Sequence, residues 1–486
     1  MSLTEKAPQV SSRAFKRTKI VASIGPATHS YEMILGIMKA GVNVFRFNFS
    51  HGIHDERNEQ IKWIRKASAE LDKPVAIILD LQGPKIRCGG FVAEMLIKKG
   101  DVLHFKYGAE FDEDAKIIPI EYDLSEKVKV GERIFLVDGK FKGKVAKVSK
   151  GVIDVEMENE GLFVQRAKQH KAFNVPDTSF GGDILTKKDL QDIAYGADKD
   201  FDYVAISFVQ TPEDMHHLRH LLDKHGYSPD IKIMSKIETP AAVQDGVLEE
   251  IVKASDAVMV ARGDLAVEVS PEAVPIVQRK ILAFCQKHAK ISIVATQMLI
   301  SMVDNPTPTR PEVSDIANAV ITGADSVMLS EETTVGEYPV EVVKTMKRVI
   351  LYTQENVAVR PIYEFPESDA LQDAISDVVM ALAHEINAAA IVVETKSGKT
   401  ARMVASRRPH MPIVAVTSNQ RVCQELALLY GTMAFVRPDG VSAGLDLAMW
   451  LKEKEVFKKG DRVVIVSGKQ PGLIGGTDTI KVRVLE

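Results

Sequence analysis

The sequence is poor in cysteine, and this scarcity limits the chemistry that the chain can perform. Only three cysteines occur among its 486 residues: Cys88, Cys285 and Cys423. Their odd number, wide separation and lack of metal-ligand spacing argue against a disulfide framework and against a cysteine-bound metal. We therefore expect three unpaired thiols in a reducing cytoplasm.

Long apolar runs and a large net charge are missing as well. No run reaches the ~18 apolar residues of a membrane-spanning helix, and the first residues lack the apolar core of a secretory signal. The formal net charge of −4 creates no overall basic field, so nucleic acid is not an expected partner. Hydrophobic residues make up 45% and charged residues 26% of the chain, which is typical of a globular protein. The length predicts roughly two to four domains.

Buried strands recur through the first two thirds of the chain. Apolar, β-branched runs of this kind are typical of parallel strands that helices cover. The runs lie at 18–25, 42–50, 74–83, 203–208, 231–238, 257–262, 291–297 and 326–332. Helical segments are predicted between them at 33–40, 54–71, 212–225, 241–254, 272–289 and 313–322. Eight strand–helix units predict a (β/α)8 TIM barrel.

Two further regions interrupt or follow this pattern. The interval between the third and fourth runs is much longer than one crossover helix requires. Its excess, residues 85–177, has short alternating strands and glycine-containing turns, which predict a small β-barrel domain inserted after strand 3 as a lid. Strands and helices alternate again over 355–486, which predicts a C-terminal α/β domain. The barrel itself is then expected to comprise 1–84 and 178–354.

Charged and polar side chains follow several of the predicted barrel strands. The C-terminal ends of all strands in such a barrel meet at one mouth, where active sites are built. A lone charge there is more often part of a surface ion pair, but such endings on four or more strands are hard to explain by solvation. The residues concerned are Arg46, Asn48, Ser50, His51, Asp80, Lys85, Arg87, Lys236, Glu238, Arg262, Asp264 and Thr296.

Two carboxylates and several cations in this set point to a chemistry. Glu238 and Asp264 suit Mg²⁺, which binds one or two protein carboxylates together with substrate oxygens and water. Arg46, Arg87 and Lys236 could bind a phosphate. A metal with a cation cluster, and without a nucleophilic Cys or His, indicates phosphoryl transfer by positioning and electrostatics. Arg262 could alternatively serve only to orient Asp264.

Two other patterns in the sequence carry less weight. Four histidines, His216, His217, His220 and His225, fall on one predicted helix, where a solvated face is a simpler explanation than a zinc site. The segment SGKT at 397–400 lacks the glycine that a P-loop requires, because Val393 stands in that place.

The chain resembles the pyruvate kinases over almost its whole length. The resemblance implies their barrel, inserted β domain and C-terminal α/β domain. It also implies Mg²⁺-dependent phosphoryl transfer from phosphoenolpyruvate to ADP, giving pyruvate and ATP in the last step of glycolysis. The matching stretches are RTKIVASIGPAT (17–28), AGVNVFRFNFSHG (40–52), IKIMSKIE (231–238), MVARGDLAVE (259–268), ATQML (295–299) and PTRPEVSDIANAVITGADSVMLSEET (308–333).

The resemblance assigns roles to the residues that match the family's motifs. Glu238 and Asp264 would hold Mg²⁺ or Mn²⁺. Lys236 would be the principal cation at the moving phosphoryl group, and Thr296 would help to protonate the enolate. The implied catalytic residues are Lys236, Arg46, Arg87 and Thr296. The implied substrate-binding residues are Arg46, Lys236, Ala261, Arg262, Gly263, Asp264 and Thr296, and the implied nucleotide-binding residues are Asn48, His51, Arg87 and Lys171.

One departure from the family makes a prediction about monovalent cations. Many members bind K⁺ at the positions of Asn48, Ser50, Asp80 and Leu81, with Thr in place of Leu81 and Glu in place of Lys85. Exchanging Glu for Lys changes the local charge by about two units, so the Lys85 ammonium could repel and replace the cation. We expect an enzyme that needs no K⁺. The alternative is that Lys85 points outward and changes nothing.

Regulation and assembly are implied by the resemblance alone. An effector loop is expected at Thr395, Lys396, Ser397, Gly398, Lys399 and Thr400, opposite residues 467–478. Its backbone N–H groups could cradle a phosphate. A sugar monophosphate, a nucleotide monophosphate and fructose 1,6-bisphosphate are all open as the effector, and a homotetramer is expected.

Two competing functions stay open on the sequence. A metal-dependent barrel aldolase or lyase would share Glu238 and Asp264, but would have no use for ADP or for Lys171. A binding protein that kept the barrel without turnover would have no reason to bury the charges of Lys236 and Glu238, because such burial costs free energy.

Overall fold

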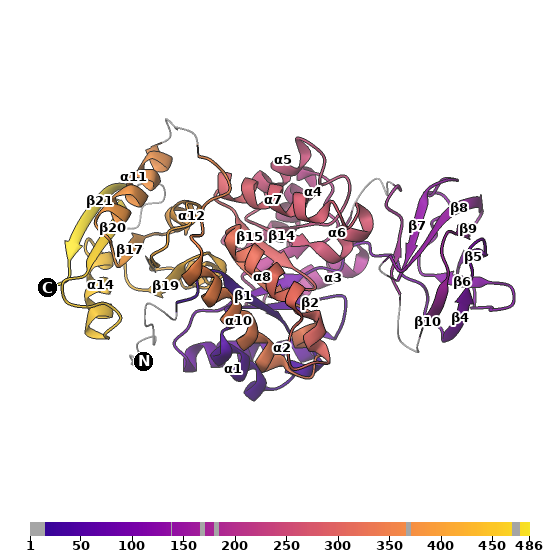
Figure 1. Ribbon diagram of the computed structural model, residues 1–486, viewed down its shortest axis with the longest axis horizontal. Coiled ribbons are helices and arrows are strands. Elements are labelled where there is room, and N and C mark those ends of the chain that lie inside the picture. Colours follow the sequence, from indigo (N-terminus) through magenta and orange to yellow (C-terminus); the bar gives the residue numbers. More distant parts are fainter. Residues whose placement is uncertain (1–14, 138, 166–170, 179–183, 366–370, 469–476) are drawn as a thin grey trace.

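The molecule has three parts that lie in a row. The computed structural model describes residues 15–137, 139–165, 171–178, 184–365, 371–468 and 477–486. In Figure 1 a parallel barrel lies in the middle, with strands β4–β10 at one end of the molecule and β17–β21 at the other.

The central part is a closed barrel of parallel strands. The strands neighbour one another in the order β1-β16-β15-β14-β13-β12-β3-β2. Most of their side chains are fully buried, because helices cover the outside and side chains fill the inside. This explains the continuous apolar runs of the sequence, and the predicted fold class is confirmed. The strands are β1 (Lys19–Ser23), β2 (Val44–Asn48), β3 (Ala76–Asp80), β12 (Tyr203–Ile206), β13 (Lys232–Ile237), β14 (Ala257–Ala261), β15 (Ile291–Ala295) and β16 (Ser326–Leu329).

The six predicted helical segments correspond to helices of the barrel, and one of them begins much later than predicted. The segment predicted from residue 241 becomes helical only at Val247, because Gly246 has φ 82° and the residues before it form turns. Helices α3, α6, α9 and α10 were not predicted. The helices are α1 (Tyr31–Ala40), α2 (His54–Glu70), α3 (Lys187–Gly196), α4 (Pro212–Lys224), α5 (Val247–Ala254), α6 (Arg262–Glu268), α7 (Val274–Lys287), α8 (Arg310–Ile321), α9 (Glu331–Thr334) and α10 (Pro339–Asn356), with short helices η2 (Pro26–Thr28) and η3 (Ile300–Val303).

The inserted domain is all-β and has its own core. Strands β4 and β10 form an antiparallel pair, and the other strands form a sheet in the order β11-β7-β8-β9-β5-β6. Phe105, Phe141 and Phe163 are buried at its centre. The strands are β4 (Ala93–Ile97), β5 (Val102–Tyr107), β6 (Ile117–Ile120), β7 (Arg133–Leu136), β8 (Phe141–Ser149), β9 (Val152–Met157), β10 (Gly161–Gln165) and β11 (Phe173–Asn174).

The C-terminal domain is a five-stranded sheet between helices. Its strands lie in the order β19-β18-β17-β20-β21, and β21 runs antiparallel to β20 at one edge. The strands are β17 (Ala390–Glu394), β18 (Ile413–Thr417), β19 (Thr432–Val436), β20 (Arg462–Gly468) and β21 (Thr477–Val484). The helices are α11 (Leu371–Glu385), α12 (Lys399–Ser406), α13 (Gln420–Glu425), η4 (Leu426–Leu428) and α14 (Ala443–Glu453).

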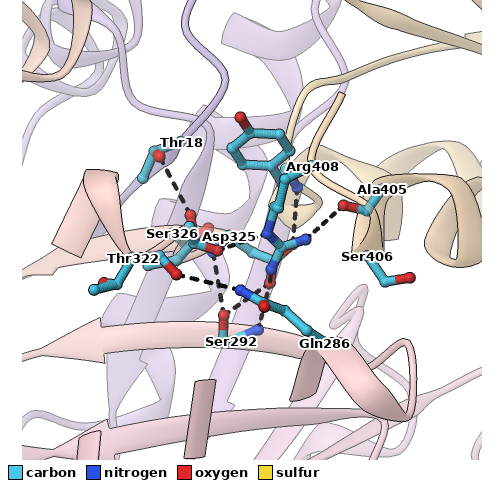
Figure 2. Close-up of polar contacts among 12 residues, drawn as sticks. Thr18, Gln286, Ser292, Thr322, Asp325, Ser326, Ala405, Ser406 and Arg408 are labelled. Carbon is cyan, nitrogen blue, oxygen red and sulfur yellow. Dashed lines mark hydrogen bonds and ion pairs between the residues drawn. The ribbon is translucent and has the colours of Figure 1, made fainter. Parts of the chain in front are cut away.

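A buried ion pair fastens this domain to the barrel (Figure 2). Arg408 Nη2 lies 2.9 Å from Asp325 Oδ2, and each side chain is only 1% exposed. Arg408 also donates to the Gly323 carbonyl, and Asp325 accepts from Ser292 and from the Tyr430 backbone N–H. Asp325 comes directly before β16. The C-terminal domain therefore contacts the end of the barrel opposite to the mouth.

Glu425 is a second buried charge at this contact, and it makes a prediction about stability. Its side chain is 2% exposed, and its nearest ion-pair partner among the described residues, Lys232, lies 3.5 Å away. Burial raises the pKa of Glu425 to about 8. Between the pKa of an unfolded glutamate and pH 8, the folded chain holds a proton that the unfolded chain has released. The free energy of unfolding therefore falls as the pH rises through this window.

We expect Glu425→Gln to flatten this pH dependence, because glutamine stays neutral. The variant should melt at least about 2 °C above the parent protein at pH 8 and differ less from it at pH 5. Scanning calorimetry across this range measures the effect, with Glu331→Gln as an exposed control. Parallel melting profiles for parent and variant would contradict the prediction.

The three cysteines are unpaired, as expected from the sequence. All three thiols are free and buried, and burial raises the pKa of Cys88 and of Cys423 to about 12. In the part of the chain that the structure describes, no helix is both long and apolar enough to cross a membrane.

Candidate active site

Lys236 lies at the centre of the polar groups at the barrel mouth. It sits near the end of β13, with its Nζ 3.5 Å from Asp80 Oδ1 and 3.6 Å from Glu238 Oε2. The ammonium also donates to Ser207 Oγ at 2.6 Å. Burial works to lower the pKa of Lys236, but the charges of Asp80 and Glu238 outweigh it and the pKa is raised. The side chain is therefore a fixed positive charge.

Arg46 supplies a second cation beside the first. Strands β2 and β3 are paired, with Asn48 in register with Asp80. The guanidinium of Arg46 donates from Nε to Asp80 Oδ2 at 2.6 Å and from Nη1 to Ser23 Oγ at 3.0 Å. Asp80 thus lies between Arg46 and Lys236 and holds both cations in place.

Glu238 has a buried carboxylate oxygen that faces the Lys236 ammonium at 3.6 Å and accepts no hydrogen bond from the described residues. Oε1 accepts from the Phe208 backbone N–H at 2.7 Å, whereas Oε2 is buried and has no hydrogen-bond donor among the described residues. Burial raises the pKa of Glu238 to about 7, although Lys236 acts in the opposite direction. A buried carboxylate oxygen of this kind fits a bound divalent cation.

Asp264 is the second expected metal ligand, and it is paired with Lys85. Lys85 Nζ lies 2.7 Å from Asp264 Oδ1, and the two side chains are 20% and 24% exposed. Burial would raise the pKa of Asp264, but the Lys85 ammonium keeps it below its ordinary value. Lys85 therefore points into the site and not outward. No group of three or more His, Cys, Asp and Glu residues arranged for a metal occurs among the described residues.

Arg262 fixes the backbone around Thr296. Its guanidinium pairs with Asp315 at 2.7 Å and donates to the carbonyls of Thr296 at 2.6 Å and Ala295 at 3.0 Å. Thr296 Oγ1 accepts from the Gly263 backbone N–H at 2.9 Å. Thr296 has φ 69°, an unfavourable value for a β-branched residue, so the surroundings hold it in a strained position. The guanidinium does not hydrogen-bond Asp264, so the alternative role of orienting that residue is not supported.

The predicted nucleotide side of the mouth is rich in cations. Partial burial lowers the pKa of the His51 imidazole, and the charges of Arg87, Arg46, Arg57 and Lys188 lower it further. The positive charges of Arg46 and Arg87 therefore disfavour a second proton on the His51 imidazole.

The loop after β2 is held by a hydrogen bond within the loop and by Arg57 of α2. Asn48 Oδ1 accepts from the Ser50 backbone N–H at 3.1 Å. Arg57 donates to the carbonyls of His51 and of Asn48, in the latter case at 3.2 Å.

Lys171 and Arg87 lie on the two chain segments that connect the inserted domain to the barrel. Arg87 and Ala172 form an antiparallel bridge, and the Cys88 N–H donates to the Lys171 carbonyl at 2.9 Å. The two predicted residues are therefore brought side by side by backbone pairing, at the border between the inserted domain and the barrel.

Two functional neighbours were missed by the sequence reasoning. Ser207 follows β12 and bonds Lys236, so it could have been found as the polar residue that ends the fourth barrel strand. Asp315 lies on α8 and pairs with Arg262, and nothing in the sequence signals this pairing.

The predicted effector loop follows β17 and extends into α12, whose first residue is Lys399. Gly398 has φ 75° and comes directly before α12. The Lys396 ammonium lies 2.7 Å from Asp439 Oδ2 and donates to Ser418 Oγ at 2.6 Å. Thr400 Oγ1 lies 2.8 Å from Thr477 Oγ1. Most of the opposing loop, residues 469–476, falls outside the described residues.

Comparisons with known proteins agree with the arrangement of these parts. The family model "Pyruvate kinase, barrel domain" matches residues 15–343, and "Pyruvate kinase, alpha/beta domain" matches residues 373–483. The pyruvate kinase of Geobacillus stearothermophilus is 40% identical to this chain, over 97% of the chain and 80% of that protein. The pyruvate kinase of Clostridium perfringens is 37% identical, over 96% of the chain and 99% of that protein. Pyruvate kinase 2 of Synechocystis sp. is 38% identical, over 97% of the chain and 80% of that protein.

Proposed function

The chain belongs to the pyruvate kinase family and is a phosphotransferase, and we propose that its reaction requires Mg²⁺ but not K⁺. The substrates are phosphoenolpyruvate and ADP, and the products are pyruvate and ATP. The observation that carries the proposal is the convergence of Lys236, Arg46, Glu238 and Asp264 at one barrel mouth. Cations and carboxylates in this arrangement suit phosphoryl transfer by electrostatic stabilisation.

Mg²⁺, or Mn²⁺ in its place, would be held by Glu238 and Asp264. Glu238 Oε2, which is buried and accepts no hydrogen bond in the described part of the chain, supports this assignment. When bound, the metal supplies positive charge to substrate oxygens and orients them. Lys85 would share Asp264 with the metal, and its ammonium would reduce the negative charge that this carboxylate presents.

The protein cations bind and neutralise the group that is transferred. Lys236 and Arg46 lie on either side of Asp80. The Arg46 N–H groups that bind neither Asp80 nor Ser23 would donate to phosphoryl oxygens, and Lys236 would add its positive charge beside them. Arg87 would bind from the inserted domain's connection, and His51, Asn48 and Lys171 would contact the nucleotide. Closure of the inserted domain over the mouth would exclude water, which would otherwise hydrolyse the phosphoryl group.

Thr296 would deliver the proton that turns the enolate into pyruvate, through an intervening water. Its hydroxyl already accepts from the Gly263 N–H, so the hydroxyl proton is free to be directed toward the mouth. Gly263 and its neighbours Ala261 and Arg262 would bind the substrate carboxylate. The pairing of Arg262 with Asp315 supports a role in holding this backbone in place.

K⁺ independence rests on Lys85. Its ammonium would supply the positive charge that a bound K⁺ would supply in other family members. Those members would bind the K⁺ at the positions of Asn48, Ser50, Asp80 and Leu81. Leu81 offers only its backbone, and its carbonyl accepts from Ser207 Oγ at 2.7 Å. Asp80 is already paired with Arg46. These contacts support a site that works without a monovalent ion.

The assay that tests the function is pyruvate formation from phosphoenolpyruvate, ADP and Mg²⁺ in a K⁺-free buffer, repeated with KCl. Full activity without K⁺ is expected. Activity that appears only with KCl would keep the kinase and remove the Lys85 argument. Absence of ADP-dependent pyruvate in both buffers would favour the lyase or a protein without turnover.

We also expect regulation through Thr395–Thr400 by a phosphorylated small molecule, in a cytoplasmic homotetramer. Gly398 has a left-handed conformation before α12, and a Cβ placed on it would lie 2.9 Å from Arg402 Nη1, so a guanidinium lies beside this loop. Lys396 is engaged by Asp439, so a phosphate would have to displace this ion pair or use the hydroxyls and backbone instead.

A calorimetric titration with glucose 6-phosphate, AMP and fructose 1,6-bisphosphate tests the effector loop. Saturable binding of one of them is expected, and Thr395→Ala should weaken it about tenfold, with the exposed Thr307→Ala in the barrel as a control. No saturable binding, or binding that Thr395→Ala leaves unchanged, would remove the effector site.

A further inference from the structure

Helix α6 lies between the barrel and the inserted domain, at the end of the barrel that faces this domain (Figure 1). The helix is anchored to the barrel through Arg262, which pairs with Asp315 and bonds the backbone after β15. The expected metal ligand Asp264 lies in its first turn, and Glu268 is its last residue.

The inserted domain is joined to the barrel by two segments that are paired with each other. The Phe173 N–H donates to the Ile86 carbonyl at 3.0 Å, and the Cys88 N–H donates to the Lys171 carbonyl at 2.9 Å. Because these bonds tie the segments together, the two connections must move as one unit.

Both connecting segments are attached to α6 by their side chains. Lys85, on the first segment, pairs with Asp264 at 2.7 Å. Asn174, on the second, donates from Nδ2 to Glu268 Oε1 at 2.8 Å. In addition, a Cβ placed on Gly139 of the inserted domain would lie 3.5 Å from Val267 Cγ2, so this domain also packs against α6 directly.

The hydrogen bond between Asn174 and Glu268 is buried, and few other described groups are placed to bond either side chain. Asn174 is 5% and Glu268 7% exposed, and Asn174 Oδ1 has no hydrogen-bond partner among the described residues. Lys85 and Arg133 are the positive groups near Glu268, and Asp264 is the negative one. Arg133 is engaged by Asp177 at 2.6 Å. Asn174 therefore has Glu268 as its one side-chain partner in the described part of the chain.

A cavity of about 360 Å³ lies beside this bond. Its lining includes Lys85, Asn174, Glu268, Gln210 and Gln244. The connecting segments are thus not packed continuously against the barrel. Beside the cavity the segments make fewer packing contacts with the barrel. Each hydrogen bond from a segment to α6 therefore contributes more to holding the inserted domain in place than it would in a filled core.

We propose that Glu268 is a positioning residue which, through Asn174, holds the inserted domain over the barrel mouth. The inference deepens the proposed function, since it rests on this domain closing over the site. Because Glu268 and Asp264 share one short helix, the same helix sets the position of both the expected metal ligand and the inserted domain. Loss of the bond releases one of the two side-chain attachments to α6, so the inserted domain should occupy more open positions.

The distance between the inserted domain and the barrel can be measured directly. Spin labels on Leu96→Cys in β4 and Ile276→Cys in α7 would report it, because both sites are more than half exposed and the natural cysteines are buried. We expect Asn174→Ala and Glu268→Ala to broaden the label distances and raise the open fraction about tenfold relative to the closed one. Glu268→Gln keeps an acceptor oxygen and should retain the parent distances. Glu272→Gln, an exposed change four residues away, is the matched control.

A double-mutant cycle separates the pair from a general structural effect. Asn174→Ala and Glu268→Ala together should open the domain no more than either change alone, because they break the same bond. Both single variants should raise KM for ADP more than they lower kcat. Parent-like distances in both single variants, or additive effects in the double variant, would overturn the proposal. Since the distances are read without turnover, they stand even if the enzyme makes no pyruvate, which would contradict the proposed function instead.

Discussion

Replacing Lys236 with methionine should lower kcat by about a thousandfold while leaving the fold intact. The ammonium lies within 3.6 Å of both Asp80 and Glu238, and it is the one lysine that reaches both of them among the described residues. Removing a fixed cation from a phosphoryl-transfer site costs roughly 10³–10⁵ in rate. Methionine nearly preserves the side chain's volume, so packing should change little.

A change on the same strand provides the control. Lys232→Met removes a lysine from the other end of β13, beside Glu425, and should leave kcat within about twofold because it is far from the mouth. Steady-state kinetics on both variants, with Mn²⁺ affinity measured by titration, give the comparison. Comparable kcat values for Lys236→Met and the parent would show that Lys236 does not stabilise the transferred group.

Changing Lys85 to glutamate should make the enzyme depend on K⁺. The parent ammonium lies 2.7 Å from Asp264 Oδ1, and a glutamate in its place would add negative charge beside Asp264 and near Glu268. The charge of the site falls by about two units, and a monovalent cation is the simplest replacement. We expect activity without K⁺ to fall about a hundredfold and KCl to restore much of it.

A neutral variant distinguishes charge from shape at this position. Lys85→Met removes the positive charge without adding a negative one, so its activity in K⁺-free buffer should lie between those of the parent and Lys85→Glu. Activation curves against KCl, with NaCl at the same ionic strength as a control, separate a bound cation from screening. If Lys85→Glu is inactive both with and without K⁺, the charge-replacement argument is wrong.

The barrel could be predicted from the sequence because its strands are buried on both sides. A run such as that of β14, Ala257–Ala261, has no polar face, and only a helix-covered parallel sheet explains it. The polar residues at the ends of these strands predicted the mouth, because the C-terminal ends of all barrel strands meet there. The start of α5 was misplaced because turns precede Gly246, and local sequence signals place helix boundaries poorly.

The contacts across the mouth could not be predicted in the same way. The pairing of Lys85 with Asp264 joins residues on different elements, and so does that of Arg262 with Asp315. Such pairs depend on how the elements pack, which no local pattern encodes. The charged residues at the mouth could therefore be predicted from the sequence. Which of them form ion pairs depends on the packing of the elements and is known only from the structure.

The backbone pairing of Arg87 with Ala172 has a consequence for the order in which the chain assembles. Strands β3 and β12 are neighbours in the barrel, although the whole inserted domain separates them in the chain. Bringing two strands together across so long a segment slows folding, because the entropy of closing the loop must be lost first. Once the inserted domain has folded and joined its own ends, the remaining loop is short. The insertion should then behave kinetically like an ordinary crossover, and the barrel can close at the rate of a chain without it.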